Sequence, residues 1–166
     1  MADGTTYDSV FELMQSGVYV ITTDDGAAKG GCTAVWVCRS SFEPPMVAVF
    51  LAPKRHTHEI LSNARNFCVN IVGEHHKDLA RNFGLRSSRD ADKFAGISTE
   101  KGKSGAPILK DACAYLDCEL ASEFPAGDHT CFIGRVVAAG RNSYEAPLLF
   151  MHEDFYPEEK EATGQN

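Results

Sequence analysis

The pattern of apolar and polar residues along the chain predicts more strands than helices. Val18–Thr23 is rich in β-branched and aromatic residues, Asp24–Gly26 has the composition of a turn, and a second strand-like run follows at Gly31–Cys38. Together these segments predict a β-hairpin. Met46–Ala52 is apolar at every position, as expected of a strand that is covered on both faces. Further strands are predicted at Phe67–Val72, around Leu116–Leu120, at His129–Ala139 and at Ala146–Met151.

Three short helices are expected among these strands, at residues 6–16, at His58–Ala64 and near Lys77–Phe83. The first would begin at Thr5 or Thr6 and carry its apolar side chains on one face. Thr57 is well placed to cap the second, because a threonine before a helix can accept a hydrogen bond from a free backbone N–H group.

The segment that follows the third helix has no hydrophobic period. Residues 84–106 are polar and contain glycine, so they form either a functional lid or a poorly ordered excursion. Elsewhere, successive hairpins with little strict βαβ alternation favour a mainly β fold with short helices. We therefore expect an antiparallel barrel or sandwich rather than a doubly wound sheet.

The composition fits one globular domain, because 43% of the 166 residues are hydrophobic and 23% are charged. We expect this domain over residues 1–151 and an acidic, solvated tail over residues 152–166. The net charge of −7 disfavours nucleic acid as a partner. No apolar run is long enough to span a membrane, and the first residues do not resemble a signal peptide, so a cytoplasmic location is expected.

Several catalytic and metal-binding motifs are absent. Gly102–Ser104 resembles the end of a P-loop, but that motif needs a glycine where Ile97 stands. His58 and Glu59 begin a zincin motif that has Ser62 in place of its second histidine, and neither C-x-x-C nor G-x-S-x-G occurs. No metal site is therefore expected, and the six cysteines should be mostly reduced, buried thiols.

Two segments could hold a ligand. Lys54, Arg55, His56 and Thr57 run directly into a predicted helix, whose free N–H groups and dipole would attract phosphate. An ordinary capped helix with a solvated basic entry would have the same residues.

Gly30–Val37 begins with two glycines and contains the only tryptophan, so a flat ligand could approach its backbone amides. A glycine bulge followed by a core strand also explains that segment.

Taken in order, short segments over about residues 9–150 resemble the flavin reductase-like family. Each segment by itself is short and does not identify a family, but the order and spacing of the segments are specific. The matching segments are Gly17–Thr23, Gly31–Val37, Ser41–Val47, Arg55–Leu61, Phe67–Ile71, Asn82–Gly84, Asp92–Phe94, Gly105–Pro107, Leu116–Cys118 and Gly127–Val136. Because members of this family have the FMN-binding split-barrel fold, the resemblance implies an antiparallel split β-barrel that binds FMN.

The resemblance also implies which residues contact the cofactor. The strand Thr33–Cys38 would lie along the isoalloxazine and ribityl chain, His56 and Thr57 would receive the phosphate, and Phe83 and Gly84 would close the pocket. Val35 and Cys38 differ from the hydroxyl or amide residues of many members, so contacts there would use the backbone. The full expected cofactor-binding set is Cys32, Thr33, Ala34, Val35, Trp36, Val37, Cys38, Lys54, Arg55, His56, Thr57, Phe83 and Gly84.

The function that the resemblance favours is an FMN-dependent NAD(P)H oxidoreductase of the flavin reductase type. NADH or NADPH would give a hydride to the flavin, and electrons would pass to oxygen, free flavin, ferric iron or a redox partner protein. A flavoredoxin-like electron carrier that does not use pyridine nucleotide, and a flavin-binding module without catalysis, remain alternatives. FMN is expected rather than FAD because no second pyrophosphate loop is evident. A homodimer with the flavin pockets at its two-fold interface is also implied.

His129 is the candidate catalytic residue. The resemblance puts it beside the open face of the flavin, where its imidazole would contact the nicotinamide or protonate reduced flavin. The alternative is that His129 only caps a turn together with Asp128.

Overall fold

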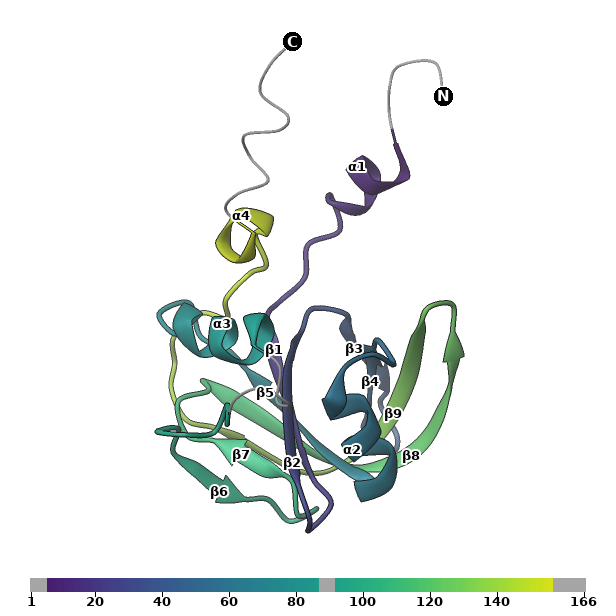
Figure 1. The fold of residues 1–166 in the computed structure, drawn as a ribbon, viewed down its shortest axis with the longest axis vertical. Helices are drawn as coiled ribbons and strands as arrows, with labels where there is room; N and C mark the ends of the chain where they lie inside the picture. The colour runs from purple at the N-terminus through teal and green to yellow at the C-terminus, as the bar shows by residue number, and fades with distance from the viewer. Residues whose placement is uncertain (1–5, 87–91, 157–166) are drawn as a thin grey trace.

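The protein has a mainly antiparallel β fold with short helices, as expected. A computed structural model describes residues 6–86 and 92–156 (Figure 1). Seven strands form one sheet in the order β2-β1-β5-β8-β9-β4-β3, and β6 pairs with β7 separately. The elements are α1 (Tyr7–Phe11), β1 (Tyr19–Asp24), β2 (Lys29–Ala34), β3 (Val37–Ser41), β4 (Met46–Leu51), α2 (His56–Ala64), β5 (Asn66–Ile71), α3 (Lys77–Leu85), β6 (Thr99–Lys101), β7 (Pro107–Leu109), β8 (Ala114–Ala126), β9 (His129–Arg141) and α4 (His152–Phe155).

The first hairpin forms where the sequence predicts it, with β1 and β2 paired in antiparallel fashion. Its turn is stabilised by Asp25, whose carboxylate accepts hydrogen bonds from the N–H groups of Ala27 and Ala28 at 2.9 and 2.7 Å. Gly26 in the same turn has a φ angle of 87°, which glycine adopts without steric cost. Because these interactions are local, the turn can be predicted from the sequence.

The expected single strand over Gly31–Cys38 is wrong, because the chain there belongs to two strands at opposite edges of the sheet. β2 ends at Ala34, β3 begins at Val37, and the strand order separates them by the whole sheet. Val35 and Trp36 carry the chain from one edge to the other, and β2 also contacts β4. The sheet therefore curls into a split barrel, with the crossing segment at the split.

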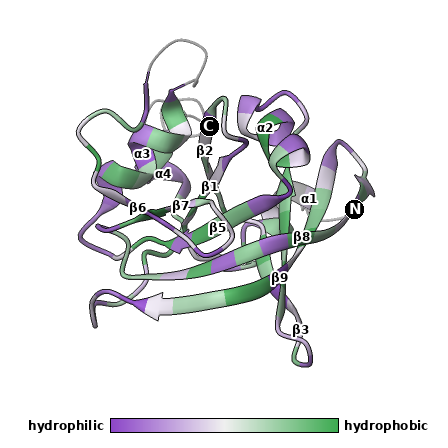
Figure 2. Ribbon diagram, turned by 90° about the horizontal axis from the view of Figure 1, so that it is seen from below, coloured by the Kyte–Doolittle hydropathy of each residue, from purple (hydrophilic) through white to green (hydrophobic). Residues whose placement is uncertain are grey.

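Two apolar clusters lie on the two sides of the curled sheet. The barrel interior contains Ile21, Val49, Phe67 and Phe132, all fully buried. The second cluster lies between the sheet and the pair α3 and α4, and it includes Val20, which is next to Ile21 in β1. Neighbouring residues of a strand point to opposite faces, so one strand serves both clusters. Figure 2 shows the apolar colouring along the strands and on parts of the helices that cover them.

The first helix is shorter than predicted and does not pack on the sheet. Ser9 N–H donates to Thr6 Oγ1 at 3.2 Å, which confirms Thr6 as the residue at the helix start. The helix itself ends at Phe11 and lies apart from the barrel (Figure 1). Phe11 at its end is 65% exposed, and Leu13, two residues beyond the helix, is 79% exposed. Among the described residues, the apolar side chains of the expected helix are therefore left largely exposed, and they do not form one continuous helix face.

The capping role expected of Thr57 is also wrong. α2 begins at His56, its N-cap is Arg55, and no side chain caps it. Thr57 is the second residue of the helix and is 1% exposed. Because the helix starts two residues earlier than expected, Thr57 lies inside the helix, where it is buried, and not before it.

Residues 92–106 belong to the folded domain, and residues 87–91 lie outside the described part. Lys93 is 4% exposed, and β6 pairs with β7 from Thr99 to Leu109. The strand expected at Ala146–Met151 is absent, because that segment makes only isolated bridges at Pro147 and Leu149.

The folded domain continues beyond residue 151, where the acidic tail was expected to begin. α4 follows at once, and its Phe155 is 6% exposed and packs in the second apolar cluster. Residues 157–166 of the expected tail lie outside the described residues. Within residues 6–86 and 92–156, none of the helices has the length and apolar character needed to cross a membrane.

Candidate functional site

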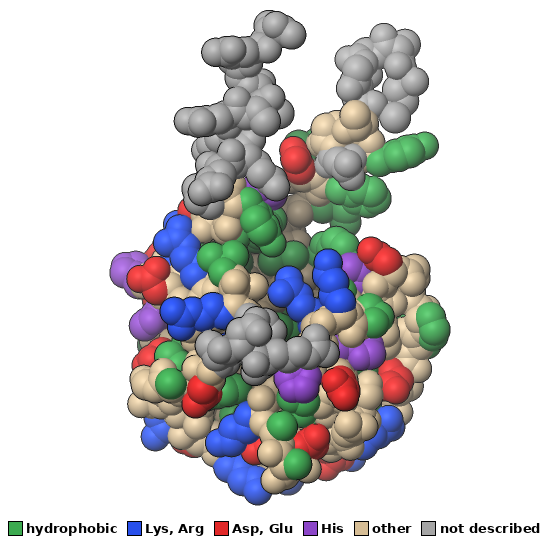
Figure 3. Space-filling view, in the orientation of Figure 1, with side chains coloured by type: hydrophobic (Ala, Val, Ile, Leu, Met, Phe, Trp, Pro, Cys, Tyr) green, Lys and Arg blue, Asp and Glu red, His purple; other side chains and the backbone are tan. Residues whose placement is uncertain are grey.

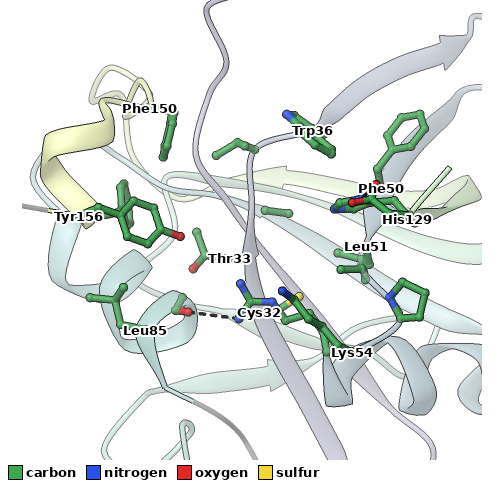
Figure 4. A pocket seen from close by; sticks show the side chains of 18 residues that line it. Cys32, Thr33, Trp36, Phe50, Leu51, Lys54, Leu85, His129, Phe150 and Tyr156 are labelled. Atoms are coloured by element: carbon green, nitrogen blue, oxygen red, sulfur yellow. Dashed lines mark hydrogen bonds and ion pairs between the residues drawn. The ribbon is translucent and has the colours of Figure 1, made fainter. Parts of the chain in front are cut away.

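A cavity of about 610 Å³ lies at the split of the barrel. Its walls come from β2 and the crossing segment, the start of α2, the end of α3, the β8–β9 turn and the C-terminal segment (Figure 4). This volume falls in the range of about 300–1,000 Å³ that is typical of small-molecule sites. The split in the sheet therefore produces a pocket of the size of a ligand site.

One wall depends on the close approach of α3 to β2. A Cβ atom on Gly31 would lie 2.5 Å from Phe83 Cε1, and a Cβ atom on Gly84 would lie 3.2 Å from Thr33 Cβ. The Thr33 hydroxyl donates to the Ala80 carbonyl at 2.6 Å. Because that proton is already used within the protein, Thr33 presents the pocket with an oxygen that can only accept.

The start of α2 gives the pocket a basic end. Lys54 and Arg55 line the cavity, and Arg55 Nη1 donates to the Gly84 carbonyl at 3.5 Å. This bond joins the start of α2 to the end of α3 (Figure 4). On the face shown in Figure 3, basic side chains lie beside apolar surface below α1 and α4. Cationic side chains at a helix start are suited to an anion.

Behind this end, Cys32 and Thr57 form a buried contact. Burial raises the pKa of the Cys32 thiol, while a hydrogen bond with the Thr57 side chain and the Lys93 ammonium act in the opposite direction. The Thr57 side chain is thus engaged inside the protein. It would reach a ligand phosphate only through its backbone.

His129 lies in the pocket wall with an acidic and an aromatic neighbour. Its Nδ1 is 2.7 Å from Asp128 Oδ1, and its ring centroid is 4.6 Å from that of Trp36. The hydrogen bond to His129 lowers the pKa of the Asp128 carboxyl. A carboxylate on Nδ1 orients the imidazole and favours a proton on that nitrogen, which leaves Nε2 for other partners. Both the turn contact and the pocket position expected for His129 therefore occur together.

Aromatic side chains from the C-terminal segment form a wall that the sequence analysis missed. Phe150, Phe155 and Tyr156 line the cavity. In Figure 4, Phe150 and Tyr156 lie on the side opposite Trp36 and His129. Their segment is fixed to α3 by a 2.7 Å ion pair between Lys77 Nζ and Asp154 Oδ1. The acidic composition of residues 152–166 concealed this, although Phe155 and Tyr156 were an available signal.

Of the expected site residues, the structure brings one group to the cavity. These are Cys32, Thr33, Ala34, Val35, Trp36, Lys54, Arg55, Gly84 and His129. The cavity is also lined by Phe50, Leu51, Ala52, Pro53, Leu85 and Asp128, which the sequence analysis did not place in the site.

The remaining expected residues do not line this cavity. Val37 packs against the barrel core, and Cys38 is exposed on the edge strand β3, because the chain has already crossed the sheet at Trp36. His56 Nδ1 lies 3.4 Å from Glu59 Oε2. Thr57 and Phe83 are buried behind the wall. Contact between any of these residues and a cofactor stays a prediction.

The chemistry of this pocket fits a flavin. Its apolar and aromatic walls suit a flat heterocycle, and its basic end suits a phosphate group. No cluster of His, Cys, Asp or Glu suited to a metal ion is found among the described residues. All six cysteines are free thiols, and only Cys38 among them is exposed.

Comparisons with known proteins agree with this fit. The sequence pattern of the flavin reductase like domain matches residues 11–159. The reductase subunit HsaB of a flavin-dependent monooxygenase from Rhodococcus jostii is 35% identical over 153 residues, which cover 89% of this chain and 74% of HsaB. The chain spans 24% of the length of Diflavin flavoprotein A 1 from Synechocystis, to which it is 38% identical over 140 residues.

Solved structures with this fold include flavin-binding proteins. An FMN-binding protein from Thermus thermophilus has a TM-score of 0.81 and 29% identity, covering 93% of this chain and 91% of that one. The NADH:FAD oxidoreductase SgcE6 from Streptomyces globisporus has a TM-score of 0.79 and 31% identity, covering 85% of this chain and 84% of that one. Sequence and structure together show that this chain belongs to the flavin reductase-like family of flavin-binding oxidoreductases.

Proposed function

We propose that this protein is an FMN-dependent NAD(P)H reductase whose flavin occupies the cavity at the split of the barrel. The observation that carries the proposal is the polarity of that cavity, which is basic at the start of α2 and aromatic at its other walls. The bound flavin would supply the redox chemistry, by accepting a hydride and passing electrons on. The residues of this chain bind, orient and shield it.

FMN is preferred to FAD in this proposal because the cavity has one basic end. Lys54 and Arg55 would neutralise a single phosphate group beside the N–H groups that start α2. The name of SgcE6 assigns FAD to that relative, whereas the Thermus thermophilus protein is named for FMN. Chromatography of the flavin released by heat separates the two, and recovery of FAD alone would contradict the proposed cofactor.

His129 is proposed to contact the nicotinamide. Its side chain is 20% exposed, and Asp128 and Trp36 fix its ring at the pocket wall. A nicotinamide would have to stack transiently over the flavin, since no separate dinucleotide-binding motif occurs in the sequence. His129 would then align the hydride donor, and alignment strongly affects transfer rates.

A partner protein is proposed as one electron acceptor. HsaB is named as the reductase subunit of a flavin-dependent monooxygenase, which suggests an oxygenase that consumes reduced flavin. Free flavin is an alternative acceptor. Adding a purified oxygenase candidate to the reduced protein, and following substrate hydroxylation, tests this part of the proposal.

We also propose a homodimer. The exposed apolar side chains of α1 and of the residues that follow it, including Val10 and Met14, are suited to packing against a second copy. Light scattering of the flavin-loaded protein should report about twice 18.1 kDa. A monomer that keeps its flavin would contradict this.

Stopped-flow absorbance tests the reductase activity itself. Flavin-loaded protein is mixed anaerobically with NADH or NADPH, and the loss of flavin colour is followed. Bleaching by either nucleotide within milliseconds to seconds supports a reductase. If neither nucleotide bleaches the flavin while a low-potential redox protein does so rapidly, the protein is an electron carrier of the flavoredoxin type instead.

A further inference from the structure

Lys93 is a buried lysine directly behind the wall of the candidate flavin pocket. Its Nζ donates to the Gly31 carbonyl at 2.9 Å and to the Phe83 carbonyl at 2.8 Å. The next residues along the chain, Cys32 and Gly84, both line the cavity. The ammonium is therefore one peptide group away from two different walls, β2 and the end of α3.

The backbone around Lys93 is fixed in this position. Asn82 Nδ2 donates to the Lys93 carbonyl at 2.7 Å, and Phe94 N–H donates to Asp92 Oδ1 at 2.9 Å. The Phe94 ring packs edge-on against Phe83, with ring centroids 5.2 Å apart. A long side chain that is anchored at its backbone and 4% exposed has little freedom to move its charge elsewhere.

Lys93 and Arg55 place two cations at neighbouring carbonyls of α3. Lys93 binds the Phe83 carbonyl from behind the wall, and Arg55 binds the Gly84 carbonyl from the pocket side. Carbonyls in the last turn of a helix carry partial negative charge, which stabilises a cation there. Burial lowers the pKa of Lys93, and the Arg55 guanidinium acts in the same direction, because both disfavour a second positive charge there. A negative charge on a ligand in the pocket would be attracted by both cations. In the described part of the chain, no carboxylate forms an ion pair with Lys93.

We propose that Lys93 is a positioning residue that holds β2 and α3 together and provides a buried positive charge favouring the reduced flavin. This inference rests on the proposed function. A hydride carries two electrons and one proton from NAD(P)H, so a neutral isoalloxazine gains one negative charge as the nicotinamide becomes a cation. A fixed cation behind the wall stabilises that new charge without having to reorganise.

The test compares the reduction potential of bound FMN in the wild type and in four variants. Lys93→Met and Lys93→Gln remove the charge, Lys93→Arg keeps it, and Lys110→Met removes an exposed lysine as the control for net charge. A unit charge roughly 10 Å away in protein changes the ratio of reduced to oxidised affinity by about tenfold, which is about 30 mV for a two-electron couple. We expect this decrease in the Met and Gln variants, and a potential near the wild-type value in the Arg and Lys110 variants.

Several outcomes would overturn the role of the charge. Equal potentials in all variants would do so, and so would an equal decrease in Lys93→Arg and Lys93→Met, which would indicate geometry instead of charge. If the neutral variants do not fold, the wild type decides: below neutral pH its bound flavin should take up fewer protons on reduction than free FMN, so its potential should depend less steeply on pH. An equal pH dependence would contradict the inference. A wild-type protein that binds no flavin would instead refute the proposed function, and the role of Lys93 with it.

Discussion

Replacing Gly31 by alanine should separate the two elements that form one wall of the pocket. The added Cβ would lie 2.5 Å from Phe83 Cε1, 2.6 Å from Cδ1 of the same ring and 3.3 Å from Phe94 Cζ. Both rings are packed, since Phe83 is fully buried and Phe94 lies edge-on against it. Because Phe83 belongs to α3, we expect relief of this contact to shift α3 away from β2.

The expected cost follows from two opposing effects. Overpacking of a core by one methyl group costs about 1–3 kcal/mol. Replacing glycine by alanine restricts the unfolded chain and returns about 0.4–1 kcal/mol, provided the native φ is accessible, and Gly31 does not have a positive φ. The net loss of unfolding free energy should be about 1–2 kcal/mol. Because α3 carries Gly84 and Leu85 into the pocket, FMN affinity should fall as well.

Urea denaturation of the wild type, Gly31→Ala, Phe83→Leu and the double variant measures this cost. Removing the aromatic ring should relieve the clash, so the penalty of Gly31→Ala should fall by more than half in the Phe83→Leu background. Gly84→Ala is the matched control: its Cβ would be 3.2 Å from Thr33 Cβ, and alanine gains helix propensity there, so little loss is expected. Equal penalties of Gly31→Ala in both backgrounds would refute the reasoning.

Three further predictions follow from the same structure. His129→Ala should retain FMN but slow flavin reduction at saturating NAD(P)H several-fold, as measured by stopped flow at matched FMN occupancy. Equal rates in the variant and the wild type would leave His129 with only its turn contact to Asp128. Thr57 caps no helix, so Thr57→Val should weaken FMN binding by less than the roughly 1 kcal/mol typical of a lost helix cap. Titration of the apo-protein with FMN measures this, and a larger loss would indicate that the Thr57 side chain contacts the ligand. Burial lowers the pKa of His58, so the unfolded state takes up a proton before the folded state as pH falls below about 6.5, and the protein loses stability there. The melting temperature of His58→Gln should therefore fall less between pH 7.5 and 5.5 than that of the wild type. An equal fall in both proteins would contradict this.

The sequence predicted those parts of the fold that depend on local interactions. The β1–β2 hairpin follows from a turn that Asp25 and Gly26 stabilise within a few residues. β4 was recognisable because Val47, Ala48 and Val49 are all buried, and a strand covered on both faces has no polar alternation. Family resemblance, rather than periodicity, supplied the split barrel.

The errors occurred where long-range packing decides the structure. The apolar run from Gly31 to Cys38 gives no sign that the chain leaves one sheet edge at Ala34 and joins the other at Val37. For the same reason Cys38 was expected in the site but lies outside the cavity. Phe155 and Tyr156 follow acidic residues, and only their packing beside α3 brings them into the pocket wall.

Binding of flavin in this cavity can be tested with the single tryptophan of the chain. Trp36 is 55% exposed and lines the cavity, so its indole N–H gives one unambiguous signal in a nitrogen–proton correlation spectrum. Titration of the apo-protein with FMN should shift this signal saturably, with an endpoint at about one FMN per chain. If FMN binds while the Trp36 signal keeps its position, or if FMN does not bind at all, the assignment of the cavity as the flavin site is wrong.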